Sequence, residues 1–99
     1  MIIKNIDYLI TNIEQVCTRL YQQKNIEAMD QWLSVFNIFV DTMNELLLHE
    51  GDESRKTKYL HIFRDINNAI EAKDYILLAD VLQYDLLEEL KILKAENIS

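Results

Sequence analysis

The chain contains no proline and only one glycine, Gly51, among its 99 residues. Proline and glycine most often interrupt or end regular structure, so their near absence predicts long helices joined by few short loops. Apolar residues make up 49% of the chain and charged residues 27%, which is typical of a globular domain rather than a disordered segment. A chain of this length is expected to form one domain around a single core.

Apolar residues recur at steps of three and four in four segments, the spacing that keeps side chains on one face of a helix. The expected helices cover about residues 2–24, 26–49, 54–73 and 75–95. Asn25, Asp74 and either Asp52 or Ser54 stand where their side chains can cap the next helix. Gly51 can adopt the left-handed conformation that ends a helix. Short connections make consecutive helices antiparallel, so the sequence predicts an all-α, antiparallel up-down-up-down four-helix bundle that spans residues 1–99.

The segment DYILLADVLQYDLLEEL, residues 74–90, predicts one helix with apolar residues on more than one side. A projection at about 100° per residue gives an inner face of Tyr75, Ala79, Leu82, Leu86, Leu90 and Leu93. Leu77, Val81 and Tyr84 fall on a second side, and Ile76 and Leu87 lie on the remaining flank. Exposed contiguous apolar patches often mark interaction sites, so Leu77, Val81 and Tyr84 are the predicted partner-binding residues. The alternative is that the bundle buries a broad arc of this helix and needs no partner.

Charge and cysteine content narrow the classes of function. The formal net charge is −7, which disfavours binding to nucleic acid or to an anionic membrane surface. The apolar start of the chain carries Asp7 and Glu14 at helical spacing, so we expect part of the fold rather than a signal peptide or a membrane span. Cys17 is the only cysteine and can form no internal disulfide, which favours a reducing, cytoplasmic compartment.

The sequence contains few candidate catalytic or metal-binding residues. Diiron bundles use Glu and His three residues apart, whereas Glu45 and His49, like His61 and Asp65, are four apart. Cys17 falls on the inner face of the first predicted helix, where it acts as a small apolar side chain rather than a catalytic thiolate. We therefore expect no catalytic, cofactor-binding or metal-binding residues and no enzymatic activity.

His61 is expected to be exposed and is followed by Arg64 and Asp65. The stretch His61-Ile62-Phe63-Arg64 resembles the histidine phosphotransfer domains, which are acidic helical bundles with a basic residue three positions after the histidine. Those domains then carry a small glycine that lets the partner approach, and Asp65 replaces it here. A carboxylate at this position would repel a phosphoryl group, so an ordinary solvated histidine is the competing interpretation.

The segments LLADVL and YDLLEEL resemble the final helix of small uncharacterised helical-bundle proteins from low-GC Gram-positive bacteria. This resemblance covers about a fifth of the chain, implies a helical domain and brings no functional residues with it. In size, acidity and helix count the chain is also similar to bacterial export chaperones, including the flagellar ones, which bind an amphipathic client helix on an apolar groove. The predicted function is a non-enzymatic interaction module for a protein partner or a homodimer, with a client-helix binder and a phosphotransfer bundle as alternatives.

Overall fold

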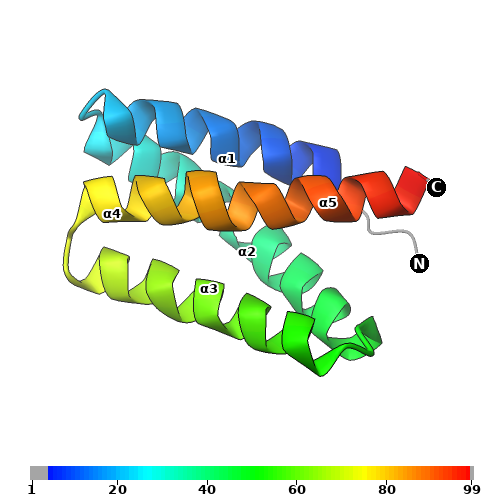
Figure 1. Ribbon diagram of the computed structural model, residues 1–99. Helices are drawn as coiled ribbons and strands as arrows, with labels where there is room; N and C mark the ends of the chain where they lie inside the picture. Colours follow the sequence, from blue (N-terminus) through cyan, green and yellow to red (C-terminus); the bar gives the residue numbers. More distant parts are fainter. Residues whose placement is uncertain (1–4, 99) are drawn as a thin grey trace.

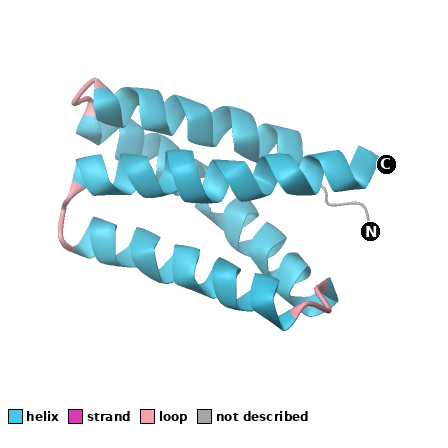
Figure 2. Ribbon diagram, in the orientation of Figure 1, coloured by secondary structure: helices cyan, strands magenta, loops and turns pink. Residues whose placement is uncertain are grey.

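The computed structural model describes residues 5–98, which form four helices and no strand (Figures 1 and 2). The first three helices are α1 (Ile6–Tyr21), α2 (Asn25–His49) and α3 (Glu53–Glu71). The last helix is continuous but has three parts: α4 (Tyr75–Asp80), η1 (Val81–Leu86) and α5 (Leu87–Ile98). The predicted all-α four-helix fold is confirmed, although α1 ends three residues before the expected bound and its expected start at residue 2 lies outside the described residues.

The turns after α1 and α3 have the same construction. Each holds one non-glycine residue with a positive φ, 62° at Gln23 and 54° at Lys73. The amide of the next residue donates back across the turn, from Lys24 to the carbonyl of Arg19 at 2.8 Å and from Asp74 to that of Ala69 at 3.0 Å. This six-to-one bond is the mark of a Schellman motif, which satisfies carbonyls at a helix end and reverses the chain tightly.

The connection between α2 and α3 is built differently from the one predicted. Gly51 does not adopt a positive φ, so its expected role as the left-handed helix end is wrong. The chain instead leaves α2 through Glu50 in an extended conformation, with φ −80° and ψ 120°. Asp52 then caps α3, because its carboxylate accepts a hydrogen bond from the amide of Ser54 at 2.9 Å.

The two other predicted caps have opposite outcomes. Asp74 caps the last helix as expected, since its carboxylate accepts from the amide of Leu77 at 3.0 Å. Asn25 was expected to cap α2 but is its first helical residue, with Lys24 at the cap position. The side-chain oxygen of Asn25 is buried and has no hydrogen-bond partner among the described residues, so this polar group stabilises the turn less than a cap would.

The last helix lies in front in Figure 1, between α1 and α3, while α2 runs obliquely behind them. Consecutive helices run in opposite directions, as predicted. Gln31 fixes α2 against α1, because its side chain bonds to Arg19 at 2.7 Å, Gln15 at 2.6 Å and Asn12 at 3.0 Å. The largest fully buried side chains come from all four helices: Leu9, Ile13, Leu20, Trp32, Phe39, Leu46, Ile66, Leu78, Leu82, Leu86, Leu87 and Leu90.

No helix within residues 5–98 combines the length and the apolar character needed to cross a membrane.

Candidate functional site

The central part of the last helix, η1, is a π-helical segment. In a π turn each N–H bonds to the carbonyl five residues earlier, so the turn holds more residues than an α turn does. Residues beyond η1 are therefore rotated about the axis, relative to a continuous α-helix, by about the 100° that separates consecutive residues. This rotation brings Leu87, predicted to lie on an outer flank, into the core beside Leu90, and both are fully buried.

The structure divides the three predicted partner-binding residues. Leu77 is 45% exposed and Tyr84 is 66% exposed, as expected. Val81 is only 6% exposed, so its predicted outward orientation is wrong. Val81 is the first residue of η1 and belongs to the core, because α1 and α3 flank the last helix on both sides and cover more of it than one stripe.

Three exposed apolar residues in the first half of the last helix, together with Tyr21 of α1, form what we call the outer patch: Tyr21, Ile76, Leu77 and Tyr84. The Tyr21 hydroxyl donates a 2.7 Å hydrogen bond to the carboxylate of Asp80, which lies one turn from both Leu77 and Tyr84. Burial and this hydrogen bond raise the pKa of Tyr21, so the phenol stays protonated and keeps the bond. The contact holds the Tyr21 ring beside the last helix.

A second uncovered apolar region lies on α2 and escaped the sequence interpretation. The spacing of three and four residues places the apolar side chains of α2 on one broad side of the helix, yet only part of that side is buried. Leu33 is 65% exposed and Phe36 is also exposed, whereas Trp32 and Phe39 are buried. The spacing contains this signal, because Leu33 and Phe36 belong to one repeat of three and four residues, and Trp32 and Phe39 belong to another.

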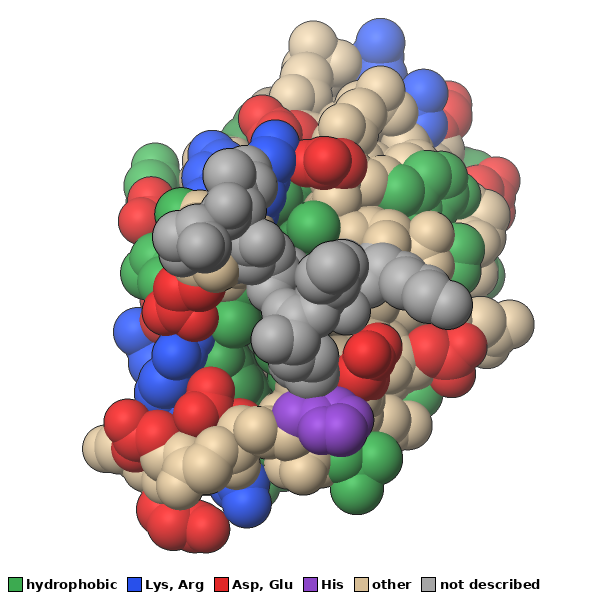
Figure 3. Space-filling model, turned by 90° about the vertical axis from the view of Figure 1, so that its right-hand side faces the viewer, with side chains coloured by type: hydrophobic (Ala, Val, Ile, Leu, Met, Phe, Trp, Pro, Cys, Tyr) green, Lys and Arg blue, Asp and Glu red, His purple; other side chains and the backbone are tan. Residues whose placement is uncertain are grey.

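Ion pairs link the helices at the end of the bundle where α3 begins and the last helix ends. Arg55 of α3 pairs with Glu50 at 3.4 Å and with Glu96 at 3.3 Å, and Lys58 pairs with Glu89. Figure 3 looks onto this end and shows acidic and basic side chains side by side. Burial alone would lower the pKa of Arg55, but Tyr59, Glu96 and Glu50 outweigh it and the pKa is raised. This arrangement ties the start of α3 to the end of the last helix.

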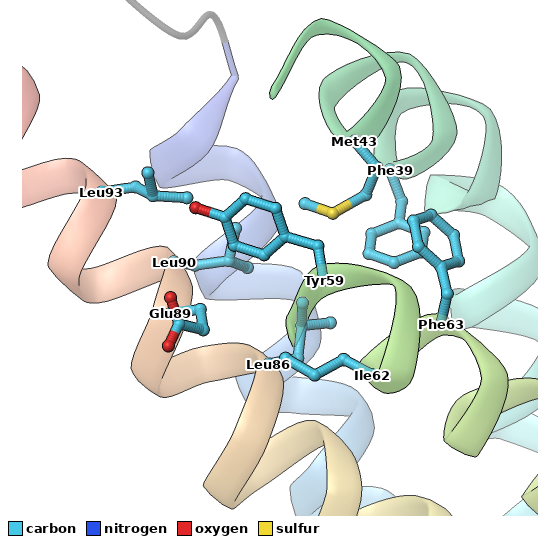
Figure 4. Close-up of a pocket in the computed structure, with 9 residues that line it drawn as sticks. All are labelled: Phe39, Met43, Tyr59, Ile62, Phe63, Leu86, Glu89, Leu90 and Leu93. Carbon is cyan, nitrogen blue, oxygen red and sulfur yellow. The ribbon is translucent and has the colours of Figure 1, made fainter. Parts of the chain in front are cut away.

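A small cavity lies next to these ion pairs, between α2, α3 and the last helix (Figure 4). Its volume is about 10 Å³, close to the minimum that one water molecule requires. Burial raises the pKa of the Tyr59 hydroxyl, and Figure 4 shows this hydroxyl directed toward Leu93. The lining residues are Phe39, Met43, Tyr59, Ile62, Phe63, Leu86, Glu89, Leu90 and Leu93. The cavity is a packing imperfection of the core and has no room for a substrate.

Cys17 and the side chains that could bind a metal ion are the remaining candidates for chemistry. Within the part of the chain that the structure describes, no group of three or more His, Cys, Asp or Glu side chains could hold a metal ion. Cys17 is buried, and its Sγ lies 3.8 Å from the carbonyl oxygen of Ala79. Burial, with a smaller contribution from Glu14, raises the pKa of the Cys17 thiol from 9.0 to about 12. A thiol with such a pKa is a poor nucleophile at neutral pH.

We expect Cys17 to resist thiol reagents in the folded protein. At pH 8 the raised pKa lowers its thiolate fraction about a thousandfold relative to an ordinary thiol, and burial blocks access further. Labelling with an aromatic disulfide reagent should therefore be at least about a thousandfold slower in buffer than in denaturing urea. A native rate within about tenfold of the unfolded rate would contradict this protection.

His61 is exposed on α3, as predicted. The guanidinium of Arg64 lies 2.9 Å from its Nδ1, and the same guanidinium lies 3.7 Å from the carboxylate of Asp65. The basic residue of the phosphotransfer resemblance therefore does contact the histidine. However, Asp65 brings negative charge to the same point, and this would oppose a phosphoryl group.

The fold and its surface define the class of protein: an all-α four-helix domain with uncovered apolar side chains on its last helix and on α2. The chain belongs to the family described as Domain of unknown function (DUF8042), whose match covers residues 1–96. Searches of curated proteins and of solved structures returned no match. The resemblance to proteins of low-GC Gram-positive bacteria stays a prediction.

Proposed function

We propose that this domain is a non-catalytic interaction module that uses the outer patch to bind a partner protein or a second copy of itself. The proposal is carried by the exposure of two large apolar side chains, Leu77 and Tyr84, which lie seven residues apart on one side of the last helix. Side chains at this spacing lie on one face and can anchor a partner helix or surface. Covering these exposed apolar side chains with a partner removes their surface from water, and this burial contributes favourable free energy to binding.

Two further observations support a binding role. Tyr21 and Tyr84 each combine an apolar ring with a polar hydroxyl, the combination that is enriched at protein interfaces. The hydrogen bond between Tyr21 and Asp80 fixes one of these rings before a partner arrives, which lowers the entropy lost on binding. We place the module in the cytoplasm as part of the proposal, because its single cysteine offers no internal disulfide.

The test compares Leu77→Glu with Val81→Glu. Leu77→Glu should lose no more than roughly 0.7–1.5 kcal/mol, because only about half of the side chain is covered. Val81→Glu should lose at least roughly 1.5–3 kcal/mol, since it removes a buried apolar side chain and introduces a charge in its place. Urea unfolding followed by circular dichroism measures both values.

Binding is then measured with the folded variants. If a second copy is the partner, light scattering should give wild-type masses above the 11.8 kDa of one chain. Leu77→Glu and Tyr84→Glu should stay monomeric, whereas Leu48→Glu, on an exposed site of α2, should associate like the wild type. If the partner is a different protein, a photo-reactive residue at position 77 should crosslink one discrete protein in cells, and Tyr84→Glu should abolish the product. A monomeric wild type without a crosslinked product would overturn the proposal.

A further inference from the structure

Helix α2 carries two parallel apolar stripes, each with steps that alternate between three and four residues. The first stripe is buried at every position: Ala28, Trp32, Val35, Phe39, Thr42 and Leu46. The second stripe follows the same repeat one flank away: Ile26, Met29, Leu33, Phe36, Val40, Met43 and Leu47. An apolar repeat of 3.5 residues is the seam that a helix uses to pack along another helix. A helix with two such seams therefore has two faces that can take a neighbour.

The rest of the bundle covers all of the first stripe but only part of the second, whose Met29, Val40 and Leu47 pack against the core while staying partly exposed. Ile26 is 78% exposed and Leu33 is 65% exposed. Met43 alone is fully inside the core. In Figure 1, α2 and α3 converge at the loop that joins them and diverge toward the start of α2, so α3 cannot lie along the whole second stripe.

Helix α3 meets α2 at the first, buried stripe, where Phe63 packs against Phe39. The ring centroids of Phe39 and Phe63 are 5.0 Å apart, and this contact joins the two helices. Within α2, the ring centroid of Trp32 lies 6.2 Å from that of Phe36 and 5.0 Å from that of Phe39. On α3, Leu60 is exposed, while Phe63 and Ile70 are half-buried.

Charge indicates which kind of helix fits this face. Residues 25–48 contain no Lys or Arg, and their charged residues are Glu27, Asp30, Asp41 and Glu45. Two copies of α2 brought together would repel each other, because like charges in opposed helices are destabilising. The basic residues Lys56 and Arg64 of α3 already have acidic neighbours, since Lys56 pairs with Glu53 and Arg64 with Asp65. At about 100° per residue, Asp30 and Asp41 fall on one flank of the second stripe, whereas Glu27 and Glu45 fall on the far side of the helix. The exposed carboxylates of Asp30 and Asp41 therefore place negative charge along that flank.

We propose that the second stripe of α2 is a docking site for a basic amphipathic helix of another protein. The stripe supplies the apolar seam, and the acidic residues beside it select Lys and Arg at the flanking positions of the partner. The most exposed part of the seam, from Ile26 to Val40, spans roughly 21 Å, which is about two heptads of a partner helix. This site is separate from the outer patch and does not depend on it.

The test uses a designed peptide of about 21 residues with Leu at the a and d positions and Lys at e and g. Fluorescence anisotropy of the labelled peptide should show binding to the whole protein. Leu33→Asp should weaken binding at least about tenfold because it interrupts the exposed seam. Leu48→Asp is the matched control: it adds the same charge at an exposed site of α2 off both stripes and should bind like the wild type.

Further measurements distinguish a basic partner helix from an acidic helix, from a second copy of the chain and from binding at the outer patch. A peptide with Glu in place of Lys should not bind, and Tyr84→Glu should not affect binding of the Lys peptide. Absence of Lys-peptide binding, equal binding by Leu33→Asp, or equal binding of both peptides would overturn the proposal. A dimer of the protein alone that Leu33→Asp dissociates would also overturn it, since the occupant would then be a second copy. Loss of peptide binding in Tyr84→Glu would assign the peptide to the outer patch instead.

Discussion

Deleting Asp85 should leave the protein folded, whereas deleting Asn37 should unfold it. Asp85 is exposed within η1, and removing one residue there converts the π turn into an α turn. Leu86, Leu87 and Leu90 then keep the orientation that they have now, relative to Leu78 and Leu82. The core survives, and the free energy of unfolding should change by about 1 kcal/mol or less, a typical effect of a single mild change.

The Asn37 deletion is the matched control, since Asn37 is exposed in the middle of a regular α-helix. Removing it rotates the rest of α2 by about 100° and carries Phe39, Met43 and Leu46 out of the core. Each of these buried side chains stabilises the fold by about 1.5–3 kcal/mol, so their combined loss is comparable to the total stability of a small domain. Circular dichroism and urea unfolding measure both variants. Unfolding of the Asp85 deletion would show that the π segment itself, and not only the helix phase, is required.

Trp32→Ala should lose about 3–5 kcal/mol, the usual cost of removing a buried Trp side chain. Trp32 is 2% exposed and its ring packs against those of Phe36 and Phe39. Its removal would therefore leave a large cavity in the core beside α2. Urea unfolding should be followed by circular dichroism, because Trp32 is the only tryptophan and the variant has no indole fluorescence.

The neighbouring Leu33 provides the control, since Leu33→Ala removes a mostly exposed side chain and should change stability by about 0.5 kcal/mol or less. If Trp32→Ala does not fold, Trp32→Phe keeps a ring in the site and allows the loss to be measured. A loss below about 1 kcal/mol for Trp32→Ala would contradict the central role of this side chain.

The number of helices and most of their bounds could be read from the sequence, because apolar spacing and caps are local signals. Asp52 and Asp74 cap α3 and the last helix as expected, since a carboxylate next to a helix start accepts a free amide wherever the helix then packs. Gly51 was misjudged because the chain can also end a helix through an extended residue, and glycine permits either route.

The candidate binding residues were only partly predictable. Leu77 and Tyr84 are exposed as the projection indicated, but the projection assumed a uniform α-helix. The π turn at Val81–Leu86 depends on how the last helix packs between its neighbours, and nothing in the local pattern reveals it. The second stripe of α2 was present in the sequence, but separating it from the first required the burial of individual residues. A pattern states which side chains are apolar, whereas the arrangement of helices decides which of them are covered.

The position of the last helix between α1 and α3 has a consequence for biosynthesis. The hairpin of α1 and α2 contains its own contacts, including those of Gln31, and can close while the chain is still being made. Helix α3 packs mainly on the element that the ribosome adds after it. We infer that the nascent bundle stays open on one side until its final helix emerges and closes it.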